Sequence, residues 1–256
     1  MATVQRRVDD VLDNYRKPET DAKHVGIELE FSSPIPMEDL AKELVHLNFD
    51  KYCSLHNDGG HYENEDNIEL AMVIPQAQMK TKFLQLGQML SELGCKFHSG
   101  SGFHVHLDMR YRNPAKAFMN LVNTQDILFA IADKVRKSGD AAHWCGKVKH
   151  TALGGVGDDD DDYGYGDGGF YDYDSKSMAI SPHLSSSKNT IEVRIRESCV
   201  DGLEIYNWVR LLCTIVDAPY IMKKVKTIKE LEQNVRLAEG IREYIQTKFS
   251  ANKKRD

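Results

Sequence analysis

The chain has 256 residues, of which 41% are hydrophobic and 28% charged, and its formal net charge is −6. This length and composition allow one substantial buried core, so we expect a single domain spanning residues 1–256. The acidic balance argues against direct nucleic-acid binding, and no apolar run is long enough to cross a bilayer. We therefore expect a cytoplasmic protein without membrane contact.

The first third of the chain predicts two helices and three strands. Residues 4–16 have apolar residues near helical spacing, and the segment GIELEF at 26–31 alternates polar and apolar residues as a strand does. A second helix is predicted at 37–48, where Pro36 stands at the first turn. Strands around 52–56 and 68–74 flank a polar, turn-rich stretch, which indicates a hairpin with a wide loop.

The rest of the chain alternates helices with strands, yet no glycine-rich phosphate-binding turn follows any strand. The strands are polar on one side only, which favours an antiparallel sheet. We expect an α+β fold with a mainly antiparallel sheet, a polar active-site face, and helices packed on the other face. The remaining predicted helices are 77–93, 114–136, 202–225 and 227–248, and the remaining predicted strands are 103–109, 177–184 and 190–197.

Residues 154–174, GGVGDDDDDYGYGDGGFYDYD, are rich in glycine, aspartate and tyrosine and nearly devoid of aliphatic side chains. Such a segment cannot nucleate a core. Two interpretations stay open: a solvated loop, or an acidic lid beside an active site that attracts a cationic substrate.

Three separate segments carry charged or imidazole side chains at alternate positions, with apolar residues between them. Residues two apart in a strand point to the same face, so each polar pair lies on one side and the apolar residues on the other. One antiparallel sheet would gather the pairs over a core. The pairs are Glu28 and Glu30, His104 and His106, and Glu192 and Arg194.

Carboxylates combined with imidazoles favour Mg²⁺ or Mn²⁺ over a thiolate zinc site. Glu69 falls on the polar side of its strand and adds a carboxylate, while Arg194 and Arg196 supply positive charge suited to a phosphoryl group. The preceding loop offers Asp58, Glu63 and Glu65. The other histidines are interpreted as surface or internally satisfied residues: His24, His46, His56, His61, His98, His143, His150 and His183.

The polar strand residues named above, taken in their order along the chain, resemble the motifs of the glutamine synthetase and γ-glutamylcysteine synthetase superfamily, in particular those of its small amidoligases. The strand at 26–31 is similar to the family's opening strand with two metal-binding glutamates. Residues 100–106, GSGFHVH, are similar to the approach to its metal-binding histidine, and 189–194, NTIEVR, to its late strand. Asp58-Gly59 with Glu69 and Pro75 resembles the intervening hairpin.

The resemblance implies a glutamine synthetase-like catalytic domain that uses ATP and Mg²⁺ or Mn²⁺ to join a carboxylate to an amine through an acyl phosphate. It implies one metal held by Glu28, His104 and Glu192, and a second held by Glu30 and Glu69. His106 and Arg194 would also contact ATP, with Arg196 as a further catalytic arginine. Asp58, or an aspartate of 158–162, would take the proton of the amine. The expected substrates are a small-molecule or peptide carboxylate and a cationic amine; the oligomeric state is left open.

Three alternative functions compete with this interpretation. A guanidino-kinase-like phosphotransferase has a similar general architecture, and the H-x-H pair is also found in cupin-like metal proteins. A cupin would need a glycine-rich all-β chain, whereas a long helix is predicted soon after His106. The third is a non-catalytic family member that binds nucleotide or metal, since fold likeness does not fix function.

Overall fold

The computed structural model describes residues 2–12, 22–57, 67–98, 101–132, 145–148, 178–184 and 189–253. The chain forms two compact units. Unit 1 comprises Met1–Val105 and Arg196–Arg210, and unit 2 comprises His106–Ile195 and Leu211–Asp256. Strands β4 (Gly102–Asp108) and β6 (Thr190–Glu197) each contribute residues to both units.

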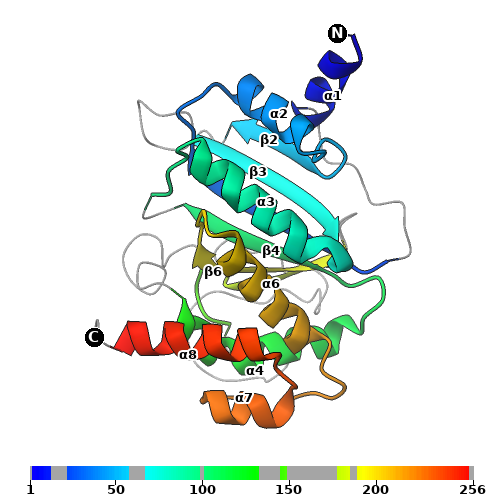
Figure 1. The fold of residues 1–256 in the computed structure, drawn as a ribbon. Coiled ribbons are helices and arrows are strands. Elements are labelled where there is room, and N and C mark those ends of the chain that lie inside the picture. The colour runs from blue at the N-terminus through cyan, green and yellow to red at the C-terminus, as the bar shows by residue number, and fades with distance from the viewer. Residues whose placement is uncertain are drawn as a thin grey trace, which may run out of the picture. The chain divides into compact units, whose positions relative to one another are not determined.

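The fold is α+β with a six-stranded antiparallel sheet, as the half-polar strands predicted (Figure 1). Among the described residues the strand order is β2-β3-β1-β4-β6-β5. The predicted hairpin is confirmed, because β2 and β3 pair antiparallel. The other strand bounds are His24–Ser32 for β1, Cys53–Asn57 for β2, Asn67–Pro75 for β3 and Ile180–His183 for β5.

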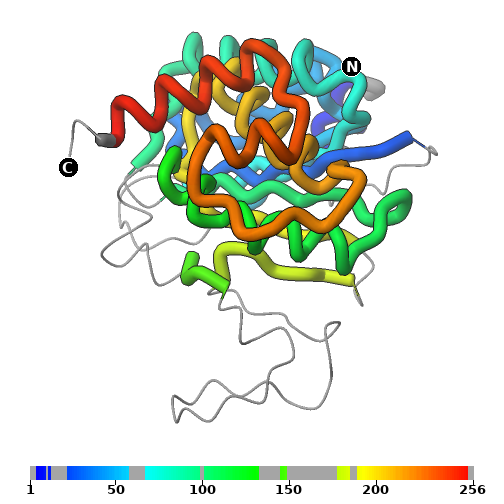
Figure 2. The backbone as a smooth tube through the Cα atoms, turned by 90° about the horizontal axis from the view of Figure 1, so that it is seen from below, coloured from blue at the N-terminus to red at the C-terminus, as the bar shows by residue number. Residues whose placement is uncertain are grey.

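In unit 1, helix α3 (Met79–Glu92) lies on one face of strands β1 and β3 (Figures 1 and 2). A short 3-10 turn, η1 (Gln76–Gln78), leads into it. Helix α1 (Ala2–Leu12) packs against α2 (Met37–His46) and β2. The alternating apolar residues that defined these strands are buried, and this burial drives the packing. The strands and α3 contribute Ile27, Leu29, Phe31, Ile68, Leu70, Met72, Phe83, Leu86 and Leu90.

Two glycines allow α3 to approach the start of helix α6 (Gly202–Val216) closely. A Cβ added to Gly87 would overlap the backbone of Gly202 and the carbonyl of Val200. A Cβ added to Gly202 would overlap the carbonyl of Phe83 and the backbone of Leu84. Since backbone atoms cannot move aside as a side chain can, both positions require glycine.

Helix α4 (Pro114–Ile131) is the central element of unit 2 and is buried on most sides. It begins where the Asn113 side chain accepts a hydrogen bond from the amide of Lys116, with Pro114 at the first helical position. Buried side-chain amides of α4 form hydrogen bonds with the backbone of other segments. The Asn120 side chain donates to the carbonyl of Tyr220, and the Gln125 side chain donates to the carbonyl of Val148 and accepts from its amide.

The C-terminal helices differ from their predicted lengths. The helix predicted at 202–225 ends at Val216. Pro219 lacks the amide hydrogen that a longer helix would need, and side-chain amides of α4 donate to the carbonyls of Tyr220 and Met222. The helix predicted at 227–248 is two helices, α7 (Ile228–Asn234) and α8 (Glu239–Lys253). Between them the backbone is extended at Val235, and Val235 and Leu237 are both buried. Burial here outweighs helix propensity.

Helix α4 is also shorter than the predicted 114–136, and α8 supplies the reason. Ala132 has extended backbone angles, and the side chain of Asn252 in α8 donates to the carbonyls of Ala130 and Ala132. These contacts satisfy carbonyl groups that the helix leaves without an intrahelical partner at its end. Helices α4 and α8 therefore pack together within unit 2.

Asp126 on α4 is expected to make the stability of the protein depend on pH. Its side chain binds Lys147 at 2.8 Å and Lys224 at 3.3 Å, and the hydrogen bond from Lys147 is the main cause of its lowered pKa. A carboxyl whose folded pKa is depressed stabilises the fold above its unfolded pKa, and this contribution is lost as the pH falls through the folded pKa.

We expect Asp126→Asn to lower the free energy of unfolding by about 0.5–1 kcal/mol at pH 7, since both lysines are half exposed and screened by solvent. The difference from wild type should vanish at a pH below the folded pKa of Asp126. Urea unfolding at several pH values measures it, and a difference that stayed constant down to acid pH would contradict the ion-pair explanation.

Candidate functional site

Strand β1 places two glutamates on its polar face. Glu28 and Glu30 are half-buried, while Ile27, Leu29 and Phe31 on the other face are fully buried. The antiparallel register sets Glu30 directly opposite Glu69 of β3, and Glu69 opposite His56 of β2. Directly opposed residues of an antiparallel pair point to the same face, so Glu69 lies beside Glu30 on the polar side.

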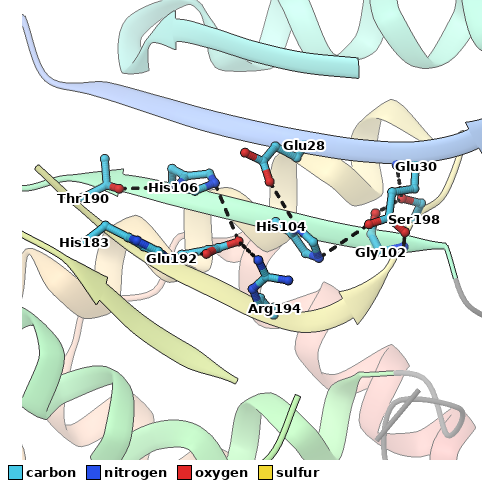
Figure 3. Close-up of polar contacts among 10 residues, drawn as sticks. All are labelled: Glu28, Glu30, Gly102, His104, His106, His183, Thr190, Glu192, Arg194 and Ser198. Atoms are coloured by element: carbon cyan, nitrogen blue, oxygen red, sulfur yellow. Dashed lines mark hydrogen bonds and ion pairs between the residues drawn. The ribbon is translucent and has the colours of Figure 1, made fainter. Parts of the chain in front are cut away.

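In unit 1, His104 lies between the two glutamates of β1 (Figure 3). Its Nδ1 is 3.1 Å from Oε2 of Glu28, and its Nε2 is 3.8 Å from Oε1 of Glu30. The imidazole is only 7% exposed. We call Glu28, Glu30 and His104 cluster 1.

The carboxylate of Glu30 is held by the backbone where β4 begins. The amide of Gly102 donates to its Oε2 at 2.5 Å. Ser198 links the same two strands, because its hydroxyl accepts from the amide of Glu30 at 3.2 Å and donates to the carbonyl of Gly102 (Figure 3). Ser198 was not among the predicted site residues, although it lies two positions after Arg196 and so continues the alternation of β6, because it follows directly after the strand ends.

In unit 2, Glu192 of β6 is the centre of a second group of polar side chains (Figure 3). Its carboxylate is nearly inaccessible, with 2% of the residue exposed. Oε2 is 2.8 Å from Nε2 of His183, and Oε1 is 3.0 Å from the guanidinium of Arg194 and 3.8 Å from Nε2 of His106. We call His106, His183, Glu192 and Arg194 cluster 2.

Of the two interpretations of His183, a surface residue or an internally satisfied one, the structure agrees with the second, because His183 contacts Glu192; the partner was not predicted. Strand β5 pairs antiparallel with β6, with Ser181 opposite Glu192 and His183 opposite Thr190. Ser181 and His183 alternate along β5 as the polar pairs of the other strands do. That alternation, within the strand predicted at 177–184, was the available signal for assigning His183 to the site.

The two clusters repeat one arrangement. In each, the Nε2 of a histidine faces a glutamate oxygen at 3.8 Å, while the Nδ1 contacts a polar side chain: Glu28 for His104, and Thr190 at 3.3 Å for His106. A distance of 3.8 Å is too long for a hydrogen bond. It suits two ligands of one cation, because ligands about 2.1 Å from a metal lie roughly 3–4 Å apart.

The contact at Nδ1 also fits metal binding, since a histidine ligand normally has its second nitrogen fixed by a polar partner. His106 and Glu192 belong to a group whose ligand atoms can hold a metal ion. The described part of the chain thus contains acidic and imidazole side chains in an arrangement capable of metal binding. No cysteine takes part in either cluster as defined.

Burial makes the thiols of Cys53 and Cys95 in unit 1 poor metal ligands. It raises the pKa of Cys53 to about 12 and also raises that of Cys95. Both thiols therefore stay protonated at neutral pH, whereas metal binding requires the thiolate. Carboxylates and imidazoles remain the natural donors in the described part of unit 1, as the sequence pattern suggested.

The other predicted site residues are distributed as follows. Arg194 contacts Glu192, but Arg196 is buried in unit 1, where it forms an ion pair with Glu204 of α6 and stacks near Trp208. A guanidinium removed from water needs such an acidic partner. Asp58, Glu63, Glu65 and the acidic segment 154–174 lie outside the described residues.

In comparisons with known proteins, no family model matches this chain and no curated protein matches it significantly. None of the described helices has the length and apolar character needed to cross a membrane.

Proposed function

We propose that this protein is an ATP-dependent carboxylate–amine ligase in which clusters 1 and 2 each bind a divalent cation, Mg²⁺ or Mn²⁺. The observation that carries the proposal is the repeated arrangement of histidine Nε2 and glutamate oxygen at 3.8 Å, with the histidine fixed through Nδ1. One such pair is common on protein surfaces. Two pairs built on the same strand, through His104 and His106, support metal binding more strongly than one pair would.

The donor set fits the proposed cations. Carboxylate oxygens suit Mg²⁺ and Mn²⁺, and the imidazoles make Mn²⁺ the better match. Both ions commonly bind together with the phosphates of a nucleotide. Glu69, opposite Glu30 in the sheet, supplies a further carboxylate next to cluster 1.

The chain's own groups would act by position and charge. ATP supplies the phosphoryl group that converts the substrate carboxylate into an acyl phosphate, and phosphate then leaves as the amine attacks the acyl carbon. Arg194, held 3.0 Å from Glu192, provides a fixed positive charge for phosphoryl oxygens. Gly102 and Ser198 hold Glu30 in place through the backbone contacts described above.

Release of ADP from ATP and Mg²⁺, measured across a panel of carboxylates and amines, tests the proposal. A ligase releases ADP, inorganic phosphate and an amide in equal amounts, and only when both substrates are present. Arginine and creatine belong in the panel, because a guanidino kinase would release ADP and a phosphoguanidine without inorganic phosphate.

Glu28→Gln is the variant to compare, because it removes the carboxylate charge beside His104 and keeps the shape of the side chain. We expect acceptor-dependent ADP release to fall at least tenfold in this variant, the lower end of the effect of a lost contact at a metal site. Equal turnover in both proteins would remove cluster 1 from the mechanism.

A further inference from the structure

We propose that His183 is a positioning residue of cluster 2, which orients the carboxylate of Glu192 so that its Oε1 faces Nε2 of His106, where both atoms would bind one cation. This inference rests on the proposed metal binding and adds a residue that the sequence pattern did not assign to the site. His183 would act through Glu192, without touching the cation or the substrate.

The two carboxylate oxygens of Glu192 face different histidines. An ionised carboxylate only accepts hydrogen bonds, so Nε2 of His183 donates to Oε2 at 2.8 Å. Oε1 is the oxygen that faces Nε2 of His106 at 3.8 Å. The hydrogen bond from His183 therefore fixes one oxygen and leaves the other directed at His106.

Arg194 makes this orientation necessary. Its guanidinium already contacts Oε1 at 3.0 Å, and guanidinium groups bind carboxylates most strongly through both oxygens at once. The terminal torsion of a glutamate is broad and restrains the carboxylate weakly. Loss of the hydrogen bond at Oε2 removes one restraint on this torsion, and a two-oxygen pair with Arg194 would then compete with the cation.

Strand β5 gives His183 a fixed position from which to act. The strand has four residues, and all of them have register partners in β6, including His183 opposite Thr190. Thr190 is also the residue whose hydroxyl contacts Nδ1 of His106. The centroids of the His183 and His106 rings are 6.2 Å apart. Strand β6 therefore positions both histidines, His183 through strand pairing and His106 through the Thr190 hydroxyl.

Binding of Mn²⁺ alone, measured by the loss of the free Mn²⁺ electron paramagnetic resonance signal, tests this role in the full chain. We expect His183→Ala to weaken Mn²⁺ binding at cluster 2 by 10- to 100-fold, the usual effect of losing a partner that orients a metal ligand, and to leave the Mn²⁺ of cluster 1 bound. His183→Gln carries an N–H near the position of Nε2 and should bind within about threefold of wild type.

His98→Ala is the matched control. His98 is also part-buried and hydrogen-bonded to a side chain, Ser32 Oγ at 2.9 Å, but it belongs to neither cluster. It should leave Mn²⁺ affinity unchanged. The thermal shift produced by Mn²⁺ gives a second reading: it should shrink in His183→Ala and persist in His183→Gln, whatever the melting temperature of each metal-free variant.

The outcomes separate the inference from the proposed function. If wild type binds Mn²⁺ and His183→Ala binds it equally well, the positioning role is wrong while the metal site stands. If His183→Gln is as weak as His183→Ala, donation to Oε2 is not what matters and the inference is also overturned. Wild-type protein that binds no Mn²⁺ would overturn the proposed function itself.

Discussion

Replacing Glu192 with glutamine is expected to lower metal-dependent ATP turnover about 100- to 1,000-fold while the protein stays folded. Glu192 is the acidic centre of cluster 2 and the counter-charge of Arg194. Glutamine keeps the shape and one oxygen but loses the negative charge that a cation requires. Loss of one such electrostatic contact in a site removed from water typically costs about 3–4 kcal/mol of transition-state stabilisation.

Steady-state ADP release measures this effect, with far-ultraviolet circular dichroism as a check on folding. Glu243→Gln makes the same chemical change at an exposed position on α8 and should leave turnover unchanged. A Glu192→Gln protein that turned over at the wild-type rate would show that cluster 2 holds a structural ion network and no catalytic metal.

Replacing Gly202 with alanine is expected to destabilise the protein by about 3 kcal/mol, the largest effect on stability that we predict for a single methyl group. The new Cβ would overlap the Phe83 carbonyl and the Leu84 backbone, so α3 and α6 would have to move apart. Overpacking usually costs about 1–3 kcal/mol, and the upper end applies because no rotamer change relieves a clash with backbone. In a chain of this size the melting temperature should fall by roughly 6–12 °C.

Gly240 provides the control for this substitution. It lies in α8, and a Cβ there would meet no atom within 4 Å. Gly240→Ala should leave stability unchanged or raise it by up to about 1 kcal/mol, because alanine favours a helix more than glycine does. Thermal unfolding of both variants distinguishes a steric effect from a general response to alanine. Equal melting temperatures would contradict the close approach of α3 and α6.

The strands that carry the clusters were predictable because their signal is local. In β1, and in β6 as far as Arg196, polar side chains alternate with apolar ones, and the alternation shows which side of each strand carries the apolar residues. The same alternation predicted that Glu69 lies on the polar side of its strand. The strand register, which sets Glu69 opposite Glu30, agrees with this prediction. The structure contains these predicted strands because each one packs its apolar side into the core, which determines the direction in which its polar side chains point.

The contacts made by His183 and Ser198 were not predictable in the same way. His183 reaches Glu192 only through the pairing of a four-residue edge strand, and Ser198 binds a strand far away in the sequence. The break between α7 and α8 likewise depends on burial of Val235 and Leu237, which helical spacing alone does not reveal. Arg196 lies two positions after Arg194, so the alternation assigns both to the same side of β6. Its pairing with Glu204 could not be predicted, because it depends on where α6 begins.

Calorimetric titration of the intact protein with ATP, with Mn²⁺ present and again with a chelator, tests whether the protein binds nucleotide through a divalent cation. We expect nucleotide binding to require the cation and to weaken at least tenfold in Glu192→Gln, because Glu192 is a proposed ligand of a cation that would bind the phosphates. A protein that binds no ATP in the presence of Mn²⁺, or binds it equally well in the chelator, would overturn the proposed function.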